Sequence, residues 1–580
     1  MPPSKRPLFG PDRRASVQSE EHAAQEIDAL LGNRQKGLNA SSNLSGFFRE
    51  AALFTWALVA TIIVIILATI LQHRSHPGQP TKPTGKRNLI FMVSDGMGPA
   101  SLSLTRSFRQ YKYDLPIDDV LVLDHHLIGS SRTRSNSSLV TDSAAGATAF
   151  SCGKKSYNGA ISVLPDHTPC GTVLEAAKRA GYMTGLVVTT SLTDATPACF
   201  ASHVNIRTEE DLIAEQEIGE HPLGRVVDLM LGGGRCHFLA NTTIGSCRAD
   251  DLDVIKLAKE KYGWNYIDNR HDFDALNPGK GIDNLPLLGL FAGYDFPFEI
   301  DRRHVIDTYP SLEEMTKMAL DILEEATRNS DQGFFLMVEG SLIDHAGHGN
   351  DPAAQVHEVL AYDKAFARVA KFLRKSDIDG VLVASSDHET GGLVTARQLH
   401  IDYPQYLWYP SVLANVSYSS EHLARRLRDK INSSPMKGKE LKKYIKNKLV
   451  QNGLGIWDST DAEVQLIIDN AQSASYYFAD MISRRAQIGW STHGHSAVDV
   501  NIYGTAGSSD LHGNHENTDI GKFLRNYLDV NVKDITEVLR ETKVFRTADN
   551  GEVGWTGRIP SEQDIESALR YHEESQDNTS

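Results

Sequence analysis

The chain has 580 residues, of which 41% are hydrophobic, and a formal net charge of -15. This length allows one very large domain or two to three ordinary ones. The acidic balance argues against a nucleic-acid-binding surface, because contact with phosphate backbones needs a concentrated basic face. A small anionic substrate would need metal ions or local arginines to offset the acidic charge.

The first 50 residues are polar and are predicted to form a cytosolic tail. Within this tail, 26-EIDALL-31 fits an acidic dileucine sorting pattern, with Glu26 placed four residues before Leu30 and Leu31. The pattern makes sense only on the cytosolic side of a membrane, where a sorting adaptor would bind it. Hexapeptides of this kind also occur often by chance.

Residues 51–71 contain no charged side chain over 21 positions. At ~1.5 Å per residue, a helix of this length spans a hydrocarbon core of ~30 Å, so the segment is predicted to be a transmembrane anchor. A cleaved signal peptide is the alternative, but it would begin within the first few residues and have a shorter apolar core. Basic residues lie on both sides of the segment and leave its orientation open.

The rest of the chain is divided into a linker, a globular domain and a second tail. Residues 72–87 are rich in Pro, Gly and Lys, as in a linker. Residues 88–545 are predicted to form one domain, with an insertion near 395–490 where the sequence turns polar and helical. Residues 546–580 are poor in apolar residues and are predicted to be a mobile tail.

Short apolar runs alternate with helical patterns in the globular part. They are typical of buried strands, and they cover residues 88–95, 185–190, 333–340 and 380–387. This alternation predicts an α/β fold, in which helices cover both faces of a mostly parallel sheet. Each run ends in acidic, hydroxyl or glycine residues. Because ligands bind outside the carboxyl ends of parallel strands, these ends are candidate sites.

Ser143 lies in the stretch 138-SLVTDSAAGATAFSCGKKSYNG-159, where small residues surround one hydroxyl group. A serine hydroxyl needs a base or a metal ion to become a nucleophile, and no G-x-S-x-G elbow is present. If a helix begins at Ser143, its first amides favour an anion such as phosphate. A helix of small residues packed tightly on a sheet would explain the composition equally well.

The five cysteines all lie after the anchor, within one stretch of about a hundred residues. They show no CxxC spacing, so a structural zinc site is not expected. In an oxidising compartment Cys236 could pair with Cys247, and Cys152 with Cys170, which leaves Cys199 over. Buried free thiols are the alternative.

Glycosylation motifs favour a lumenal or extracellular domain. Asn-x-Ser/Thr sequences that follow the anchor include those at Asn136, Asn241, Asn415 and Asn432.

Acidic residues and histidines gather in three clusters, the first of them directly after a predicted strand: 339-EGSLIDHAGHGND-351, 387-DHETGG-392 and 492-THGHSAVD-499. A single His or Asp is usually a solvated side chain. Carboxylate and imidazole groups gathered at a strand end, however, can converge on one divalent ion. Three such clusters indicate more than one metal ion.

Six stretches, in this order along the chain, together resemble the alkaline phosphatase family: 95-DGMG-98, 141-TDSAAGATA-149, 194-DATP-197, 339-EGSLIDHAGH-348, 386-SDHETGG-392 and 494-GHSAVDV-500. They span nearly the whole region from 88 to about 530. The resemblance implies a three-layer α/β/α fold around a large, mostly parallel sheet. It also implies hydrolysis of small phosphate monoesters by a homodimer that holds two Zn²⁺ and one Mg²⁺ per subunit.

The resemblance assigns a role to each matching residue. Ser143 would be the nucleophile that forms a phosphoserine, and Arg207 would clamp two phosphate oxygens. Asp142 and His345 would lie beside the phosphate.

Three metal ions would complete the implied site. One zinc, held by Asp95, Asp387 and His388, would lower the pKa of the Ser143 hydroxyl. The second zinc would stabilise the leaving oxygen and then activate water, and its ligands would be Asp344, His348 and His495. The magnesium would bind oxygen ligands, as this ion prefers, from Asp95, Thr196 and Glu339, with Asp194 just beyond them.

Some positions depart from the family pattern or leave a choice. Asp194 is similar to the bacterial enzymes, whereas His345 stands where animal enzymes carry histidine, so the identity of the third metal is open. His493 is an alternative to His495 as the last zinc ligand. Two alternative functions stay open: a related phosphodiesterase or sulfatase, and a membrane-anchored binding protein with an inactive site.

The tail and the anchor indicate the cellular compartment in which the domain lies. A sorting pattern ahead of a single anchor resembles the vacuolar alkaline phosphatases of fungi, which are type II membrane proteins with a lumenal catalytic domain. This arrangement implies a single-pass protein of the vacuole membrane.

Overall fold

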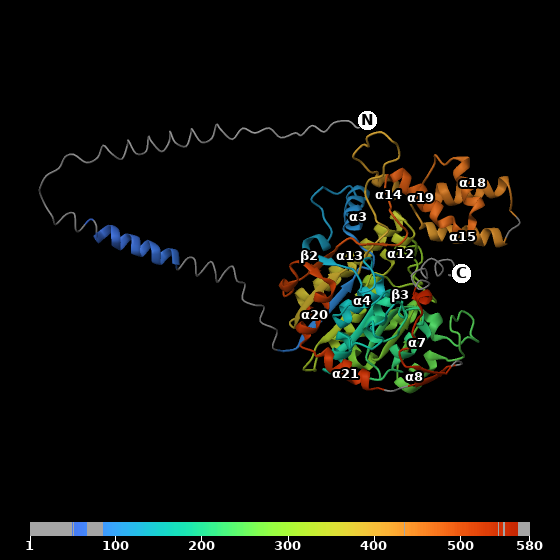
Figure 1. The fold of residues 1–580 in the computed structure, drawn as a ribbon. Helices are drawn as coiled ribbons and strands as arrows, with labels where there is room; N and C mark the ends of the chain where they lie inside the picture. Colours follow the sequence, from blue (N-terminus) through green and yellow to red (C-terminus); the bar gives the residue numbers. More distant parts are fainter. Residues whose placement is uncertain are drawn as a thin grey trace, which may run out of the picture. The chain divides into compact units, whose positions relative to one another are not determined.

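The computed structural model describes residues 49, 51–65, 85–433, 436–542, 545–548 and 551–565. The chain divides into two units, Met1–Pro80 and Thr81–Ser580, and Figure 1 shows the fold of the second. In the first unit residues 51–65 are helical, and no helix within the described ranges is both long and apolar enough to cross a membrane. Residues 66–71 of the predicted anchor lie outside the described residues, as do Glu26, Leu30 and Leu31.

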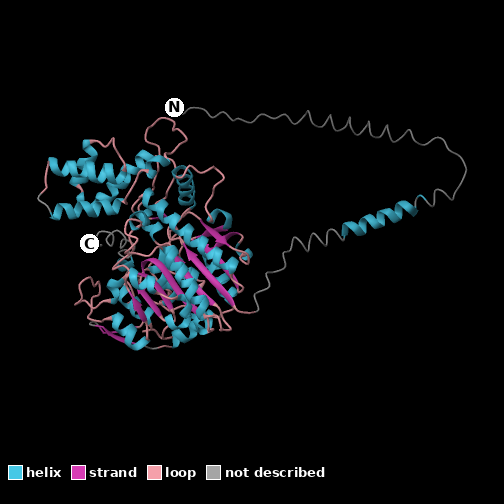
Figure 2. Ribbon diagram, turned by 180° about the vertical axis from the view of Figure 1, so that it is seen from behind, coloured by secondary structure: helices cyan, strands magenta, loops and turns pink. Residues whose placement is uncertain are grey.

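A ten-stranded sheet forms the centre of the second unit, and Figure 2 shows its strands side by side between helices. The strand order is β12-β2-β11-β8-β1-β7-β3-β4-β6-β5. Neighbouring strands run parallel except β11, which is antiparallel to both β2 and β8. The strands are β1 (Arg87–Val93), β2 (Leu127–Arg132), β3 (Met183–Ser191), β4 (Leu229–Gly233), β5 (Asn265–Ile267), β6 (Leu287–Leu290), β7 (Phe334–Glu339), β8 (Asp379–Ser385), β11 (Val500–Gly504) and β12 (Gly513–Glu516).

The four apolar runs predicted as strands are β1, β3, β7 and β8. They lie next to one another in the order β8-β1-β7-β3, so they form the middle of the sheet. Their carboxyl ends consequently meet at one edge, where residues distant in the sequence come together.

Two hydrophobic cores cover the two faces of the sheet. Side chains of β1 alternate between them, with Ile90 and Met92 in one core and Leu89, Phe91 and Val93 in the other. The first core includes α3 (Pro99–Lys112), α11 (Leu312–Ala326) and α13 (Pro352–Lys375), and the second includes α5 (Val173–Arg179), α8 (Val254–Tyr262) and α20 (Asn517–Leu528). The predicted three-layer α/β/α fold is confirmed.

The predicted insertion contains a group of helices that Figure 1 shows at the opposite end of the domain from α8 and from α21 (Val532–Glu541). They are α14 (Pro410–Ala414), α15 (Ser420–Ser433), α16 (Lys439–Tyr444), the π-helix Ile445–Gln451, α17 (Asn452–Leu454), α18 (Asp461–Asp469) and α19 (Ala474–Ala486). Leu423, Ile445 and Phe478 are buried in the first core, so the insertion packs as part of the domain.

Short helices and strands complete the described fold. The remaining helices are α4 (Ser143–Cys152), α6 (Ala195–Ala201), α7 (Glu210–Ile218), α9 (Arg270–Ala275), α10 (Glu299–Arg302), α12 (Leu342–His348) and α21 (Val532–Glu541). Two small sheets pair β9 (Glu389–Thr390) with β10 (His495–Ser496), and β13 (Phe545–Ala548) with β14 (Gly551–Gly554).

The chain keeps contact with the domain beyond residue 546, where the sequence predicts a mobile tail. Trp555 is buried, and its carbonyl oxygen accepts from Nε2 of Gln216 at 3.1 Å. The N–H of Asn205 donates to the carbonyl of Thr556 at 2.9 Å. A large aromatic ring that buries its surface anchors this segment.

The cysteines pair as the first alternative allows. Cys152 bonds Cys170, Cys236 bonds Cys247, and Cys199 is free and buried.

Candidate metal and phosphate site

Ser143 is the first residue of α4, at the carboxyl edge of the sheet. Asp142 caps this helix, since its Oδ1 accepts from the N–H of Ala145 at 2.9 Å. The small residues allow α4 to lie close to the end of β8, because a Cβ on Gly146 would come within 2.9 Å of the Asp387 side chain. This packing holds the Ser143 hydroxyl 3.1 Å from Nε2 of His388.

Two carboxylates lie around the same nitrogen. Oδ2 of Asp387 is 3.2 Å and Oδ1 of Asp95 is 3.5 Å from Nε2 of His388. Both oxygens are buried, and neither has a hydrogen-bond partner among the described residues. Unsatisfied buried oxygens of this kind need an explanation such as a bound ion, and a cation between them would satisfy all three groups.

A second group consists of Asp344, His348 and His495. Nε2 of His348 lies 3.3 Å from Asp344 Oδ2 and 3.1 Å from Nε2 of His495. Nδ1 of His348 contacts the carbonyl of His493, and Nδ1 of His495 contacts the carbonyl of Thr141 at 2.8 Å. Because a carbonyl only accepts, each Nδ1 carries the proton in neutral imidazole and each Nε2 presents a lone pair. Two facing lone pairs beside a carboxylate fit a cation.

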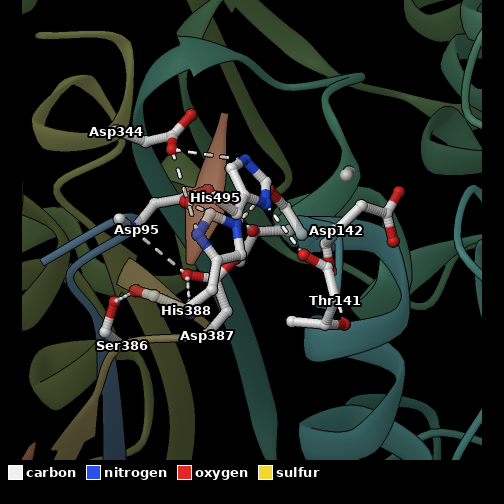
Figure 3. Close-up of polar contacts among 12 residues, drawn as sticks. Asp95, Thr141, Asp142, Asp344, Ser386, Asp387, His388 and His495 are labelled. Carbon is white, nitrogen blue, oxygen red and sulfur yellow. Dashed lines mark hydrogen bonds and ion pairs between the residues drawn. The ribbon is translucent and has the colours of Figure 1, made fainter. Parts of the chain in front are cut away.

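The small sheet of β9 and β10 brings His495 to this group. It pairs His495 with Thr390, and the hydroxyl of Thr390 donates to Oδ1 of Asp344. The ring of His495 stacks on that of His388, with ring centres 3.5 Å apart (Figure 3). The ring of His493 is exposed and bonds the carbonyl of His348 at 2.8 Å, so it lies outside the ligand group.

A third, oxygen-rich group lies on the other side of Asp95. The hydroxyl of Thr196 is 3.5 Å from Asp95 Oδ2. Glu339, at the end of β7, accepts from the hydroxyl of Ser341 at 2.7 Å. Carboxylate and hydroxyl oxygens are the ligands that Mg²⁺ prefers.

The buried side chain of Arg207 lies between two carboxylates. One guanidinium nitrogen donates to Asp194 Oδ1 at 2.7 Å, and the other lies 3.5 Å from Asp142 Oδ2. Burial opposes the charge on Arg207, but Asp194 and then Asp142 more than offset it and raise its pKa. A charged, planar guanidinium beside the N-terminus of α4 is suited to bind a phosphate.

The pKa values show that the metal-free site holds an excess of negative charge. Burial and then the neighbouring Asp387 raise the pKa of Asp95 well above its ordinary value, and burial raises that of Glu339 to about 8. Burial also acts to raise the pKa of Asp344, but the adjacent His348 lowers it well below its ordinary value. Divalent cations would replace the protons on these carboxyls, so the residues fit the metal ions that the sequence predicts.

Sequence reasoning did not find Asp295, which contacts His345. Oδ2 of Asp295 lies 3.5 Å from Nδ1 of His345, and Oδ1 accepts from the N–H of Ser191 at 2.8 Å. Asp295 follows β6, whose run of four residues is too short to stand out in the sequence. The position of an acidic residue soon after a strand was the one available signal.

Sequence reasoning also missed a cluster of Glu175, His203 and His221, whose side chains are fully buried. Oε1 of Glu175 is 2.9 Å from Nε2 of His203 and 3.3 Å from Nε2 of His221. Trp555 packs edge-on against both rings.

A family model described as alkaline phosphatase matches residues 86–530. The chain belongs to the alkaline phosphatase family. It is 53% identical over 520 residues to the repressible alkaline phosphatase of Saccharomyces cerevisiae, covering 86% of this chain and 91% of that protein. It is 46% identical to an alkaline phosphatase of Schizosaccharomyces pombe, covering 85% and 91%. The prediction of a fungal type of alkaline phosphatase, an enzyme that hydrolyses phosphate monoesters, is confirmed.

Solved structures agree with the fold. The alkaline phosphatase of Thermus thermophilus matches with a TM-score of 0.65 at 26% identity, over 85% of this chain and 97% of that one. The cold-active enzyme of a psychrophilic Shewanella matches with a TM-score of 0.63 at 30% identity, over 76% and 99%.

Proposed function

We propose that the chain hydrolyses phosphate monoesters through a covalent phosphoserine on Ser143. The observation that carries the proposal is the position of this hydroxyl. It lies at the start of a buried helix, 3.1 Å from Nε2 of His388, where the unpaired oxygens of Asp95 and Asp387 also converge. A nucleophile placed in this way attacks phosphorus, while the first amides of α4 face the phosphate.

Each residue of the site then has a task. Arg207 binds two phosphate oxygens and orients the ester for in-line attack, and Asp142 holds α4 and lies beside Arg207. Attack by Ser143 Oγ forms the O–P bond and breaks the bond to the leaving oxygen, which takes a proton and departs as an alcohol. Water then attacks phosphorus, and Ser143 recovers its proton as phosphate is released.

Two Zn²⁺ and one Mg²⁺ fit the three groups of ligands. The zinc ions would be held by Asp95, Asp387 and His388 and by Asp344, His348 and His495, and the magnesium by Asp95, Thr196 and Glu339, with Asp194 beside it. When bound, they supply positive charge that favours the ionised Ser143 hydroxyl and offsets charge on the leaving oxygen. A variant of the alkaline phosphatase from the Antarctic bacterium TAB5 is described with Mg bound in its M3 site, which supports a magnesium assignment.

We also propose a location. Residues 51–71 anchor a type II protein of the vacuole membrane, the tail binds a sorting adaptor, and the catalytic domain lies in the lumen as a homodimer. Four asparagines of the glycosylation motifs are exposed in the described part of the chain, as attachment of a glycan requires: Asn136, Asn241, Asn415 and Asn432.

Hydrolysis of p-nitrophenyl phosphate by the full chain with Zn²⁺ and Mg²⁺ tests the function. We expect activity that a chelator abolishes and the two metals restore, together with little cleavage of bis(p-nitrophenyl) phosphate. Faster cleavage of the diester than of the monoester would contradict the proposal. Trapping ³²P on Ser143 at acidic pH, and its loss in Ser143→Ala, tests the covalent step.

A further inference from the structure

A cavity of about 710 Å³ lies beside the phosphate site. Four parts of the chain line it: the loop that follows β6, the segment from α10 to Tyr309, helix α12, and the start of α15 with Tyr418 before it. Its lining includes Asp295 and His345 as well as Tyr418, Arg425 and Arg426.

The cavity borders the side of the site where the phosphate binds. His345 lies in α12 between the candidate zinc ligands Asp344 and His348, and its Nδ1 is 3.5 Å from Asp295. Asp295 in turn accepts from Ser191, which precedes Asp194 by three residues. The wall of the cavity is therefore continuous with the residues beside Arg207.

The wall contributed by α15 is held rigidly to the catalytic domain. The N–H of Ser419 donates to Asp301 at 3.0 Å, and the N–H of Ser420 donates to Asp351 at 2.7 Å. These two carboxylates occupy donors at the start of α15, which fixes the helix in place. The ring of Tyr418 stacks on His422, with centres 4.7 Å apart, and the guanidinium of Arg426 lies 5.8 Å from the ring centre of Tyr418.

Arg426 gives this wall an available positive charge. Glu421 lies 3.5 Å from Arg425, whereas no carboxylate in the described part of the chain forms an ion pair with Arg426. The other acids of the cavity are Asp295 and Asp301, and both already accept backbone N–H groups. Burial raises the pKa of Asp301 to about 7, so this carboxyl is only partly ionised at neutral pH.

We propose that this cavity receives the leaving group of the substrate, and that Arg426 favours phosphomonoesters whose leaving group carries a second anionic group, such as a carboxylate or another phosphate. The inference rests on the proposed phosphomonoesterase function and deepens it. A guanidinium at the rim binds a carboxylate or phosphate by charge-assisted hydrogen bonds. The phosphate that reacts would stay on Arg207, and the leaving group would extend toward α15.

A matched pair of substrates tests the proposal with the metal-loaded full chain. Phenyl phosphate and 4-carboxyphenyl phosphate differ by one carboxylate, and the measurement is the ratio of their kcat/KM values. We expect Arg426→Gln to lower the preference for the carboxylated ester about tenfold, because a hydrogen bond to a charged group contributes about 1.5–3 kcal/mol. Arg426→Lys should restore part of the preference, since it restores the charge.

Lys430→Gln is the control, because it removes the same charge one turn farther along α15, outside the cavity. It should leave the ratio unchanged. A ratio that stays the same in Arg426→Gln, or falls equally in Lys430→Gln, would overturn the proposal, and an equal loss on both substrates would show that Arg426 acts only through structure.

A binding measurement separates failure of this inference from failure of the proposed function. Calorimetry with phenylphosphonic acid and 4-carboxyphenylphosphonic acid, which carry a P–C bond that is not hydrolysed, needs no turnover. The carboxylated compound should bind the wild type more tightly, and Arg426→Gln should remove the difference. If the wild type binds both equally, the inference is wrong even where hydrolysis is normal. If the difference is present but neither ester is hydrolysed, the proposed function is wrong and the cavity still selects anions.

Discussion

Two buried clusters in this molecule contain the same types of residue but differ in their hydrogen bonds. One comprises Asp344, His348 and His495, and the other Glu175, His203 and His221. In the first cluster both imidazoles donate through Nδ1 to carbonyl groups, so their Nε2 lone pairs converge. Two Nε2 lone pairs that face each other repel unless a cation binds between the rings.

The second cluster has more of its hydrogen bonds made without a metal, and the one ring nitrogen that makes none, Nε2 of His221, lies 3.3 Å from Oε1 of Glu175. Nδ1 of His221 accepts from the N–H of Leu223 at 3.1 Å, so Nε2 must carry the proton in neutral imidazole. Nδ1 of His203 lies 2.8 Å from the carbonyl oxygen of Ser162, and its Nε2 lies 2.9 Å from Oε1 of Glu175, so both ring nitrogens face an acceptor within the protein. Burial acts to raise the pKa of Glu175, but His203 lowers it below its ordinary value. The partner of the second ring nitrogen, rather than the residue types, therefore distinguishes a ligand set from a structural network.

The largest effect should come from Ser143→Ala. Removing the nucleophile should lower kcat for p-nitrophenyl phosphate by more than about a thousandfold. Zinc content, measured by mass spectrometry of the metals, should stay at the wild-type value, because the ligands remain. Wild-type turnover in this variant would remove Ser143 from the mechanism, and lost zinc would make Ser143 part of the metal site.

One variant in each cluster, His495→Ala in the first and His221→Ala in the second, tests the comparison. The first should lose one zinc per chain and most activity, because it removes a ligand whose lone pair faces the site. His221→Ala should keep the full zinc content but unfold at a lower temperature, because it leaves a cavity beneath Trp555 and the Leu223 N–H unpaired. Zinc loss in His221→Ala instead would show that the Glu175 cluster also binds metal.

A smaller effect is expected for Arg207→Ala. Inhibition by inorganic phosphate should weaken by about 10–100-fold, since a buried bidentate pair to the anion is lost. Zinc affinity should change much less, because Arg207 bonds Asp194 and Asp142 rather than the zinc ligands. Unchanged product inhibition would argue against the phosphate clamp.

The sequence was sufficient for the middle of the fold and for much of the candidate site. β1, β3, β7 and β8 were predicted because they are buried on both faces and read as continuous apolar runs. The candidate ligands were found because most of them directly follow these strands or match family stretches. The sequence left open what depends on contacts between distant segments. It could not choose between His493 and His495, for example, because the choice depends on the register of β9 with β10, which pairs His495 with Thr390. No strand ends at Glu175, His203 or His221, so the sequence gives no sign that these three side chains contact one another.

The smallest expected effect is the pH dependence of stability after chelation, where the clusters should respond in opposite directions. In the metal-free site Glu339 has a pKa of about 8, whereas an unfolded glutamate titrates near ~4.3. Between these values the folded chain holds a proton that the unfolded chain has released, so a rise in pH through this window favours unfolding. The stability that Glu175 contributes is present above the unfolded value and is lost only as the pH falls below about 4, because its folded pKa is lowered.

Thermal unfolding of the chelated full chain from about pH 5 to 8 should therefore include a slope from Glu339 that lowers Tm as the pH rises, beside the titration of Asp295, Asp301 and the histidines. Zn²⁺ and Mg²⁺ should remove this slope, because the ions replace the protons. Glu339→Gln should make this slope smaller in the chelated protein, whereas Glu175→Gln should lower Tm because it leaves two buried histidines without their carboxylate. An identical slope in the chelated wild type and in chelated Glu339→Gln would contradict the raised pKa of Glu339 and, with it, the view that the two clusters carry opposite charge imbalances.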